Sequence, residues 1–118
     1  MATISKPVKQ ISGVVKYTDT SGVVLFTLPP GSVPLRWTVN VTTAFNNAGT
    51  DLLDIGKSGS TEFYAKDVDV SATGNTVVTS LNSDELTAMT AILATYTGSS
   101  TAATTGLATV ILEYTDAF

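Results

Sequence analysis

The sequence predicts an all-β protein with a single domain, folded as an antiparallel β-sandwich or barrel of about eight short strands. Three observations support this prediction. The chain has 118 residues, the length of one domain that can bury roughly two-thirds of its unfolded surface. Threonine, which is β-branched and suits the outer face of a sheet, accounts for 21 residues. Short apolar runs follow one another at regular spacing, each bounded by turn-forming residues.

The clearest strand covers residues 33–42. Its apolar side chains alternate with polar ones, and a period of two indicates one face toward a core and one toward a wetter environment. We therefore expect the side chain of Trp37, the only tryptophan, to lie in the core. The residues that the alternation places on the core side are Val33, Leu35, Trp37, Val39 and Val41.

The other strands are placed by apolar runs between turn residues. The Pro29-Pro30 pair ends one of them, because proline lacks the amide hydrogen that a β-ladder needs. Residues 1–7 are polar, so we expect an extended N-terminal arm there and the sandwich domain over 8–118. The expected strands are residues 8–17, 23–28, 33–42, 52–55, 62–70, 76–81, 86–96 and 106–114.

Two of these stretches are less regular. The run 62–70 has an irregularity near Ala65-Lys66. Residues 82–85 resemble a helix start, because two acidic residues follow a capping residue, and apolar residues then recur at helical spacing. The alternation and the threonine content after residue 86 favour a strand instead. A single helical turn at 83–86 could precede that strand.

The composition excludes several kinds of chemistry. The chain has no Cys and no His, so it lacks thiolate nucleophiles, histidine bases and the commonest zinc ligands. Its net charge is −4, and its six Lys and Arg residues are scattered, whereas nucleic-acid binding needs clustered basic side chains. No apolar run approaches the length of a membrane span. We expect no enzyme activity, no cofactor, and neither nucleic acid nor membrane as a partner.

Several motifs resemble those of a known group of proteins. They are LFTLPPG, VNVTTAFNNAGTDLLDIG, the DVDV segment at 67–70 and the closing strand ATVILEY. With these motifs the chain resembles the small virion structural proteins of tailed bacteriophages, and the resemblance covers most of the chain, from about residue 12 to residue 114. This resemblance implies a compact β-sandwich of jelly-roll type that belongs to the virus particle. No functional residue can be inferred from this resemblance, because the shared motifs are structural.

The resemblance leads to a specific functional expectation, a capsid decoration or cement protein. Such a protein binds the outer shell and bridges neighbouring capsid subunits through many weak contacts. The expected partner is the major capsid protein of the same virion. The protein is also expected to form a homo-oligomer, with a trimer favoured over other states. The expected location is the capsid surface, after synthesis in the host cytoplasm. The residues expected to make these contacts are Ile4, Lys6, Pro7, Ser99, Thr101 and Thr104.

Two other functions remain open from the sequence. One is a carbohydrate-binding module of a tail fibre or baseplate, in which exposed aromatic rings would stack on sugars. The other is a head–tail connector or a tail element, which keeps the virion role but changes the symmetry. The aromatic residues that could form a sugar platform are Trp37, Phe45, Phe63 and Tyr64.

Four aspartates are candidates for a calcium site, because calcium prefers carboxylate and carbonyl oxygens. They lack the spacing of an EF-hand loop, and carboxylates at strand ends are more often solvated or cap turns. We therefore expect no metal, and Asp67 with Asp69 has no feature of a glycosidase pair beyond the two acids. The four candidates are Asp51, Asp54, Asp67 and Asp69.

Overall fold

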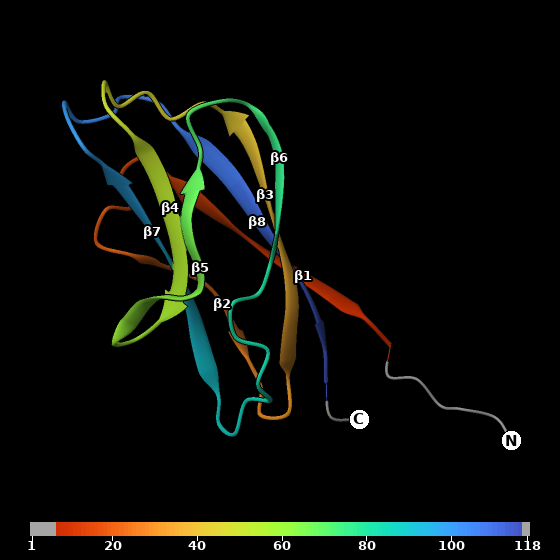
Figure 1. Ribbon diagram of the computed structural model, residues 1–118. Helices are drawn as coiled ribbons and strands as arrows, with labels where there is room; N and C mark the ends of the chain where they lie inside the picture. Colours follow the sequence, from red (N-terminus) through yellow and green to blue (C-terminus); the bar gives the residue numbers. More distant parts are fainter. Residues whose placement is uncertain (1–6, 117–118) are drawn as a thin grey trace, which may run out of the picture.

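The structure, a computed structural model, describes residues 7–116 and consists of two four-stranded sheets that pack face to face (Figure 1). Every strand pair is antiparallel, and the described residues form no helix, so none of them belongs to a helix that could cross a membrane. The predicted all-β sandwich is confirmed. The strands are β1 (Lys9–Lys16), β2 (Val23–Leu28), β3 (Val33–Thr43), β4 (Asp51–Lys57), β5 (Ser60–Asp69), β6 (Gly74–Thr79), β7 (Thr90–Gly98) and β8 (Leu107–Thr115).

The strand order is that of an eight-stranded jelly roll. Sheet I has the order β1-β8-β3-β6, and sheet II has the order β2-β7-β4-β5. The chain can be followed as one long antiparallel hairpin, in which β1, β2, β3 and β4 pair with β8, β7, β6 and β5 in turn. Curling this hairpin places β3 beside β8 and β4 beside β7, which completes both sheets.

The core lies between the sheets and is centred on Trp37 of β3. This side chain is fully buried, and its ring centroid lies 5.6 Å from that of Tyr64 and 6.3 Å from that of Phe26. The prediction that Trp37 is a core residue is confirmed. Burial of one large apolar side chain contributes about 1.5–3 kcal/mol to folding. The residues of the hydrophobic core cluster that come from the four central strands are Trp37, Val39, Val41, Leu53, Ile55, Ile92, Ala94, Tyr96, Ala108, Val110 and Leu112.

The predicted alternation is wrong at the start of β3. Val33 and Leu35 are only half-buried, whereas Pro34 between them is buried. The cause is a bulge, because the pairing of β3 with β8 shifts register between Pro34 and Arg36. One extra residue in a strand reverses which side chains face the core.

Residues 82–89 also differ from both expectations, since they form neither a helical turn nor a strand, and β7 begins only at Thr90. This segment crosses one end of the sandwich instead. Leu86 holds it there through two backbone hydrogen bonds to the β2–β3 turn: Gly31 N–H donates to Leu86 O at 2.7 Å, and Leu86 N–H donates to Ser32 O at 2.9 Å. These bonds to a distant turn replace the local bonds that a helix would need.

The two sheets approach each other closely where β1 passes β2. A Cβ atom added at Gly13 would lie 2.7 Å from the carbonyl oxygen of Leu25 and 2.8 Å from its Cα. Leu25 lies at a bulge, because the pairing of β2 with β7 shifts register between Val24 and Phe26. Only glycine fits at position 13 without displacing backbone, so this residue fixes how closely β1 and β2 pack.

Candidate functional site

The structure separates the expected contact residues into two groups. The β7–β8 loop presents one group, Ser99, Thr101 and Thr104, all exposed. Pro7 is also exposed, but it precedes β1, whose first residue pairs with the end of β8. The two groups therefore lie at opposite ends of β8, about 30 Å apart at the usual rise per residue. Ile4 and Lys6 lie outside the described residues.

Asn46 anchors the β7–β8 loop to the β3–β4 loop. Its Oδ1 accepts hydrogen bonds from the backbone N–H of Thr104 at 2.7 Å and of Thr105 at 3.0 Å. Its Nδ2 donates to Thr104 Oγ1 at 2.9 Å, and Thr105 Oγ1 donates to Ala44 O at 3.0 Å. The expected contact residue Thr104 is thus held by the neighbouring loop.

Asn47 makes a second connection between the same loops from a buried position. Its Oδ1 accepts from Gly49 N–H at 2.8 Å within its own loop and from Ser100 N–H at 2.9 Å across the gap. Beside it, Thr50 N–H donates to Ser99 Oγ at 2.7 Å, and Ser99 N–H donates to Thr50 O at 3.3 Å. The low-complexity sequence 97–105 is consequently tied down at both of its ends, and this part of the surface is pre-organised.

Asp51 connects these loops to the core. Its Oδ1 accepts hydrogen bonds from Asn47 N–H at 2.9 Å and from the Tyr96 hydroxyl at 2.5 Å. Burial and the bond to Asp51 raise the pKa of Tyr96. Tyr96 is only 2% exposed, so its hydroxyl is buried together with Asp51. Sequence reasoning missed this network, and its only local signal was the turn-forming Asn46-Asn47 pair before Asp51.

The four candidate calcium ligands fall into two pairs. Asp51 and Asp69 line a cavity of about 210 Å³ beside Ser71, and the hydrogen bonds from Ser71 to the Asp69 carboxylate lower the pKa of Asp69. Asp54 Oδ1 instead accepts from Asp67 N–H at 2.8 Å, and burial raises the pKa of Asp54. Over residues 7–116 no group of three or more acidic side chains converges in a way that could hold a metal ion.

The backbone explains why Asp67 lies beside Asp54. The pairing of β5 with β4 shifts register between Leu53 and Ile55, and Asp67 has a φ of +54° in the left-handed region. This bulge confirms the irregularity expected near Ala65-Lys66. Lys66, which precedes Asp67, forms an ion pair with Glu62 at 3.3 Å on the exposed surface.

The aromatic residues do not form a sugar-binding platform. Trp37, Phe45 and Tyr64 are each no more than 1% exposed, so their rings cannot stack on a ligand. Phe63 is half-buried, and Lys57 Nζ lies 4.0 Å from its ring centroid. This arrangement contradicts the aromatic surface that the carbohydrate-binding alternative required.

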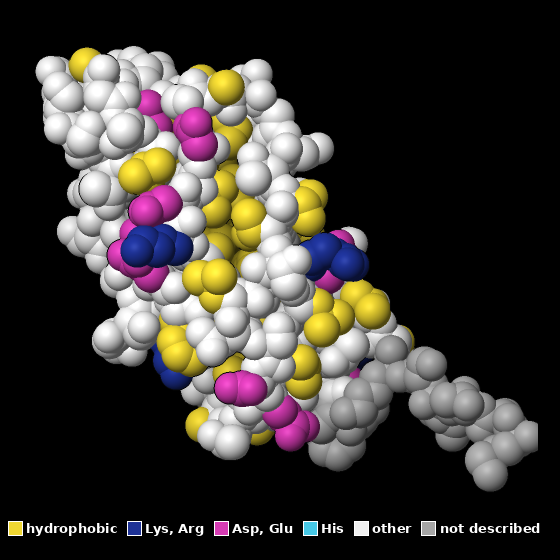
Figure 2. All heavy atoms as spheres, viewed as in Figure 1, with side chains coloured by type: hydrophobic (Ala, Val, Ile, Leu, Met, Phe, Trp, Pro, Cys, Tyr) yellow, Lys and Arg dark blue, Asp and Glu magenta, His cyan; other side chains and the backbone are white. Residues whose placement is uncertain are grey.

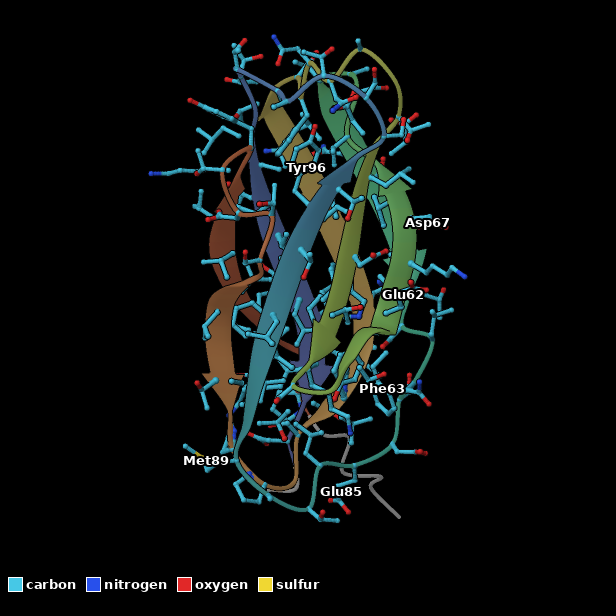
Figure 3. All side chains as sticks on the ribbon, turned by 90° about the vertical axis from the view of Figure 1, so that its left-hand side faces the viewer. Glu62, Phe63, Asp67, Glu85, Met89 and Tyr96 are labelled. Atoms are coloured by element: carbon cyan, nitrogen blue, oxygen red, sulfur yellow. The ribbon has the colours of Figure 1, made fainter. Side chains whose placement is uncertain are left out.

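Phe63 and Lys57 contribute to a cleft that the sequence did not indicate. It has a volume of about 350 Å³ and lies between β5 and the segment that crosses the end of the sandwich. Asp84 and Glu85 line its other side, and Figure 3 shows Phe63 and Glu85 at this end of the molecule. The cleft holds charges of both signs beside Phe63 and Tyr64.

These features define the class of the protein as a single-domain jelly roll whose β3–β4 and β7–β8 loops are joined by hydrogen bonds. Its fold is similar to those of chains in three phage capsid structures. The chain from the capsid asymmetric unit of cyanophage Pam1 has 20% identity and a TM-score of 0.73, over 97% of this chain and 93% of that one. The chain from the acid-stable capsid of Helicobacter pylori bacteriophage KHP30 has 12% identity and a TM-score of 0.75, over 98% and 92%.

The third similar chain comes from the capsid of Ralstonia phage GP4, with 20% identity and a TM-score of 0.68 over 98% of this chain and 88% of that one. No family model and no curated protein matches the sequence. At these identities the similarity establishes the fold, and the expected jelly roll is confirmed.

Proposed function

We propose that this protein is a non-enzymatic structural component of a phage virion, and specifically a capsid decoration or cement protein. In this role it binds the outer shell and bridges neighbouring capsid subunits. The major capsid protein is its partner, and copies associate with one another as a closed oligomer, with a trimer preferred. The protein reaches the capsid surface after synthesis in the host cytoplasm.

The observation that carries this proposal is the extent of the structural similarity. The three phage capsid chains match 97–98% of this chain, and this chain matches 88–93% of each of them. The likeness therefore concerns whole chains of similar size, and not one domain within a much larger shell protein. The matched chains come from capsids, and a small jelly roll of this size suits an accessory role in a shell.

The surface of sheet I supports the same role physically. Its outward side chains are mostly uncharged, including Thr38, Asn40, Thr109 and Ile111 along β3 and β8. The ion pair of this face, Arg36 with Glu113, links β3 to β8 within the same chain. Such a face makes weak contacts with little desolvation cost, and repetition over many copies of a shell converts weak contacts into stable attachment.

The test is binding to capsid shells that lack the protein. Purified protein should co-sediment with such shells, and an image of the loaded particles should show its mass repeated over the outer surface. Deletion of residues 1–7 should weaken binding while the circular dichroism spectrum of the isolated protein stays unchanged. Mass found only at one vertex would favour a head–tail connector, and mass found only on the tail would favour a tail element. Unchanged occupancy after the deletion would exclude the arm as a contact.

A further inference from the structure

The four edge strands of the sandwich differ in how they are protected against pairing with other chains. A free edge exposes unpaired backbone groups, and proteins usually protect it with charges, proline or bulges. β1 carries a lysine at each end, and β2 contains the bulge near Leu25. β5 carries four charged residues and the bulge near Asp67, and the N–H of Leu81 covers part of its edge by donating to Tyr64 O.

β6 has none of these protections. Its sequence, GNTVVT, contains no charge and no proline, and its six residues pair with β3 without a register shift. Five of the six residues are exposed, and the side chain of Val77 is 58% exposed. Within residues 7–116, β6 has β3 on one side and no strand on the other.

The surroundings of β6 also suit an added strand. β5 and β6 are consecutive in the chain but belong to different sheets and do not pair as strands. Hydrogen bonds join this side only beyond the end of β6, where Leu81 N–H donates to Tyr64 O and Asn82 Nδ2 donates to Phe63 O within the described residues. Figure 2 shows hydrophobic side chains along the line between these two strands. In sheet I, Val77 lies in one outward row with Thr38 and Ile111, to which an added strand would contribute the next residue.

We propose that β6 accepts an extended segment of the neighbouring shell protein, which adds to sheet I as a fifth strand. This inference rests on the proposed function and identifies the surface through which the shell is bound. Main-chain hydrogen bonds would provide the contact, and aliphatic or threonine side chains opposite Val77 would complete the outward row. Because β6 has no charged side chain, no charge on this strand disfavours the addition of such a segment.

The size of the edge favours a shell segment over a second copy of this chain. A pair of six-residue strands buries much less than the roughly 1,200–2,000 Å² that a stable interface between free proteins requires. A dimer held by β6 alone would therefore not persist in solution. A segment that the shell already holds beside β6 has a high effective concentration and needs no independent stability.

The experiment compares two single lysine substitutions at equally exposed valines on edge strands. Val77→Lys places a charge on β6, whereas Val24→Lys places it on β2, where the wild-type valine is 55% exposed. With shells that lack the protein, we expect Val77→Lys to weaken binding about tenfold or more and Val24→Lys to have little effect. Hydrogen exchange of the wild-type protein should show the amides of 74–79 protected on the shell, and those of β2 unchanged.

Each outcome has a distinct meaning. Wild-type protein that binds shells while the amides of 74–79 exchange as in the free state would overturn this inference and leave the proposed function standing. Wild-type protein that does not bind shells would overturn both. Concentration-dependent self-association of the free protein that Val77→Lys abolishes would assign the edge to a second copy instead, and would likewise overturn the shell segment as its occupant.

Discussion

The hydroxyl of Tyr96 on β7 donates a 2.5 Å hydrogen bond to the carboxylate of Asp51, the first residue of β4. The same Asp51 oxygen accepts Asn47 N–H, and Asn47 in turn accepts Ser100 N–H. One chain of hydrogen bonds therefore runs from the buried face of β7 to the exposed β7–β8 loop. The positions of the loops at this end depend on the packing of the core.

Removal of the Tyr96 hydroxyl should destabilise the fold. In the Tyr96→Phe variant the Asp51 oxygen loses a donor in a buried position, so we expect the free energy of unfolding to fall by about 1–3 kcal/mol. Urea denaturation followed by tryptophan fluorescence measures this change. Tyr114→Phe, which removes the hydroxyl of a half-buried tyrosine at the end of β8, is the control and should cost less. Equal losses in the two variants would contradict the role given to the Asp51 contact.

Stability should also decrease in alkaline solution. Burial raises the pKa of Tyr96 and of Tyr64 in the folded protein, whereas tyrosines of an unfolded chain ionise near pH 10. Above about pH 10 the unfolded state has lost protons that the folded state keeps, so the free energy of unfolding falls as the pH rises. Below that pH this contribution is fully present. Urea titrations between pH 8 and 11 should show the decrease, and a shallower one for Tyr96→Phe. If the free energy of unfolding decreases equally with pH in the wild-type protein and in Tyr96→Phe, Tyr96 is not the source of the pH dependence.

Asn47 should control the mobility of the β7–β8 loop. Asn47→Ala removes the acceptor shared by Gly49 N–H and Ser100 N–H, at an expected cost of about 1–3 kcal/mol. Hydrogen exchange at Ser100 should accelerate by more than exchange in the centre of β3. Asn75→Ala, at an exposed position of β6, is the matched control. Unchanged exchange at Ser100 would mean that Asn46 and the hydrogen bonds between Ser99 and Thr50 hold the loop without Asn47.

Gly13 should not accept even a methyl group. In Gly13→Ala the new Cβ lies within 2.8 Å of backbone atoms of Leu25, so β1 and β2 must move apart, at an expected cost of about 1–3 kcal/mol. Ser12→Ala, one residue earlier on the exposed face, should cost little. Thermal unfolding of both variants measures the difference. Equal midpoints would show that the contact between the sheets relaxes freely.

Calcium should leave the thermal midpoint unchanged. Asp51 and Asp54 already accept hydrogen bonds from the chain, and the four aspartates lie in two separate pairs. A cation that binds only the folded state would raise the midpoint as its concentration increases. Scans with calcium, magnesium and a chelator should superimpose. A calcium-specific rise that Asp69→Asn removes would reveal a site at the cavity beside Ser71.

The sequence was a good guide to the strands and a poor guide to their arrangement in detail. The period of two correctly identified Trp37, Val39 and Val41 as core residues because alternation is a local property of a strand. It failed at Pro34, because a bulge depends on the partner strand β8. The break near Ala65 was visible because the bulge interrupts the apolar pattern itself.

The candidate site was harder to predict, for a related reason. Thr104 was identified as an exposed loop residue, but its partner Asn46 lies 58 positions earlier in the sequence. Hydrogen bonds between loops so far apart leave no periodic signal. The segment 82–89 likewise combines helix-start residues with alternating ones, and the backbone bonds of Leu86 to the distant β2–β3 turn decide its conformation.

The pairing of β1 with β8 has a consequence for the folding of the newly synthesised protein. Lys9 pairs with Tyr114, so a central strand of sheet I is missing until β8 has been synthesised. A nascent chain on the ribosome can become compact, but it cannot complete sheet I before β8 has been synthesised. Contacts between residues so distant in sequence also make folding slow, on a scale of roughly milliseconds to seconds. During that interval newly made chains expose unpaired strands, so their yield should depend on temperature and on chaperone supply.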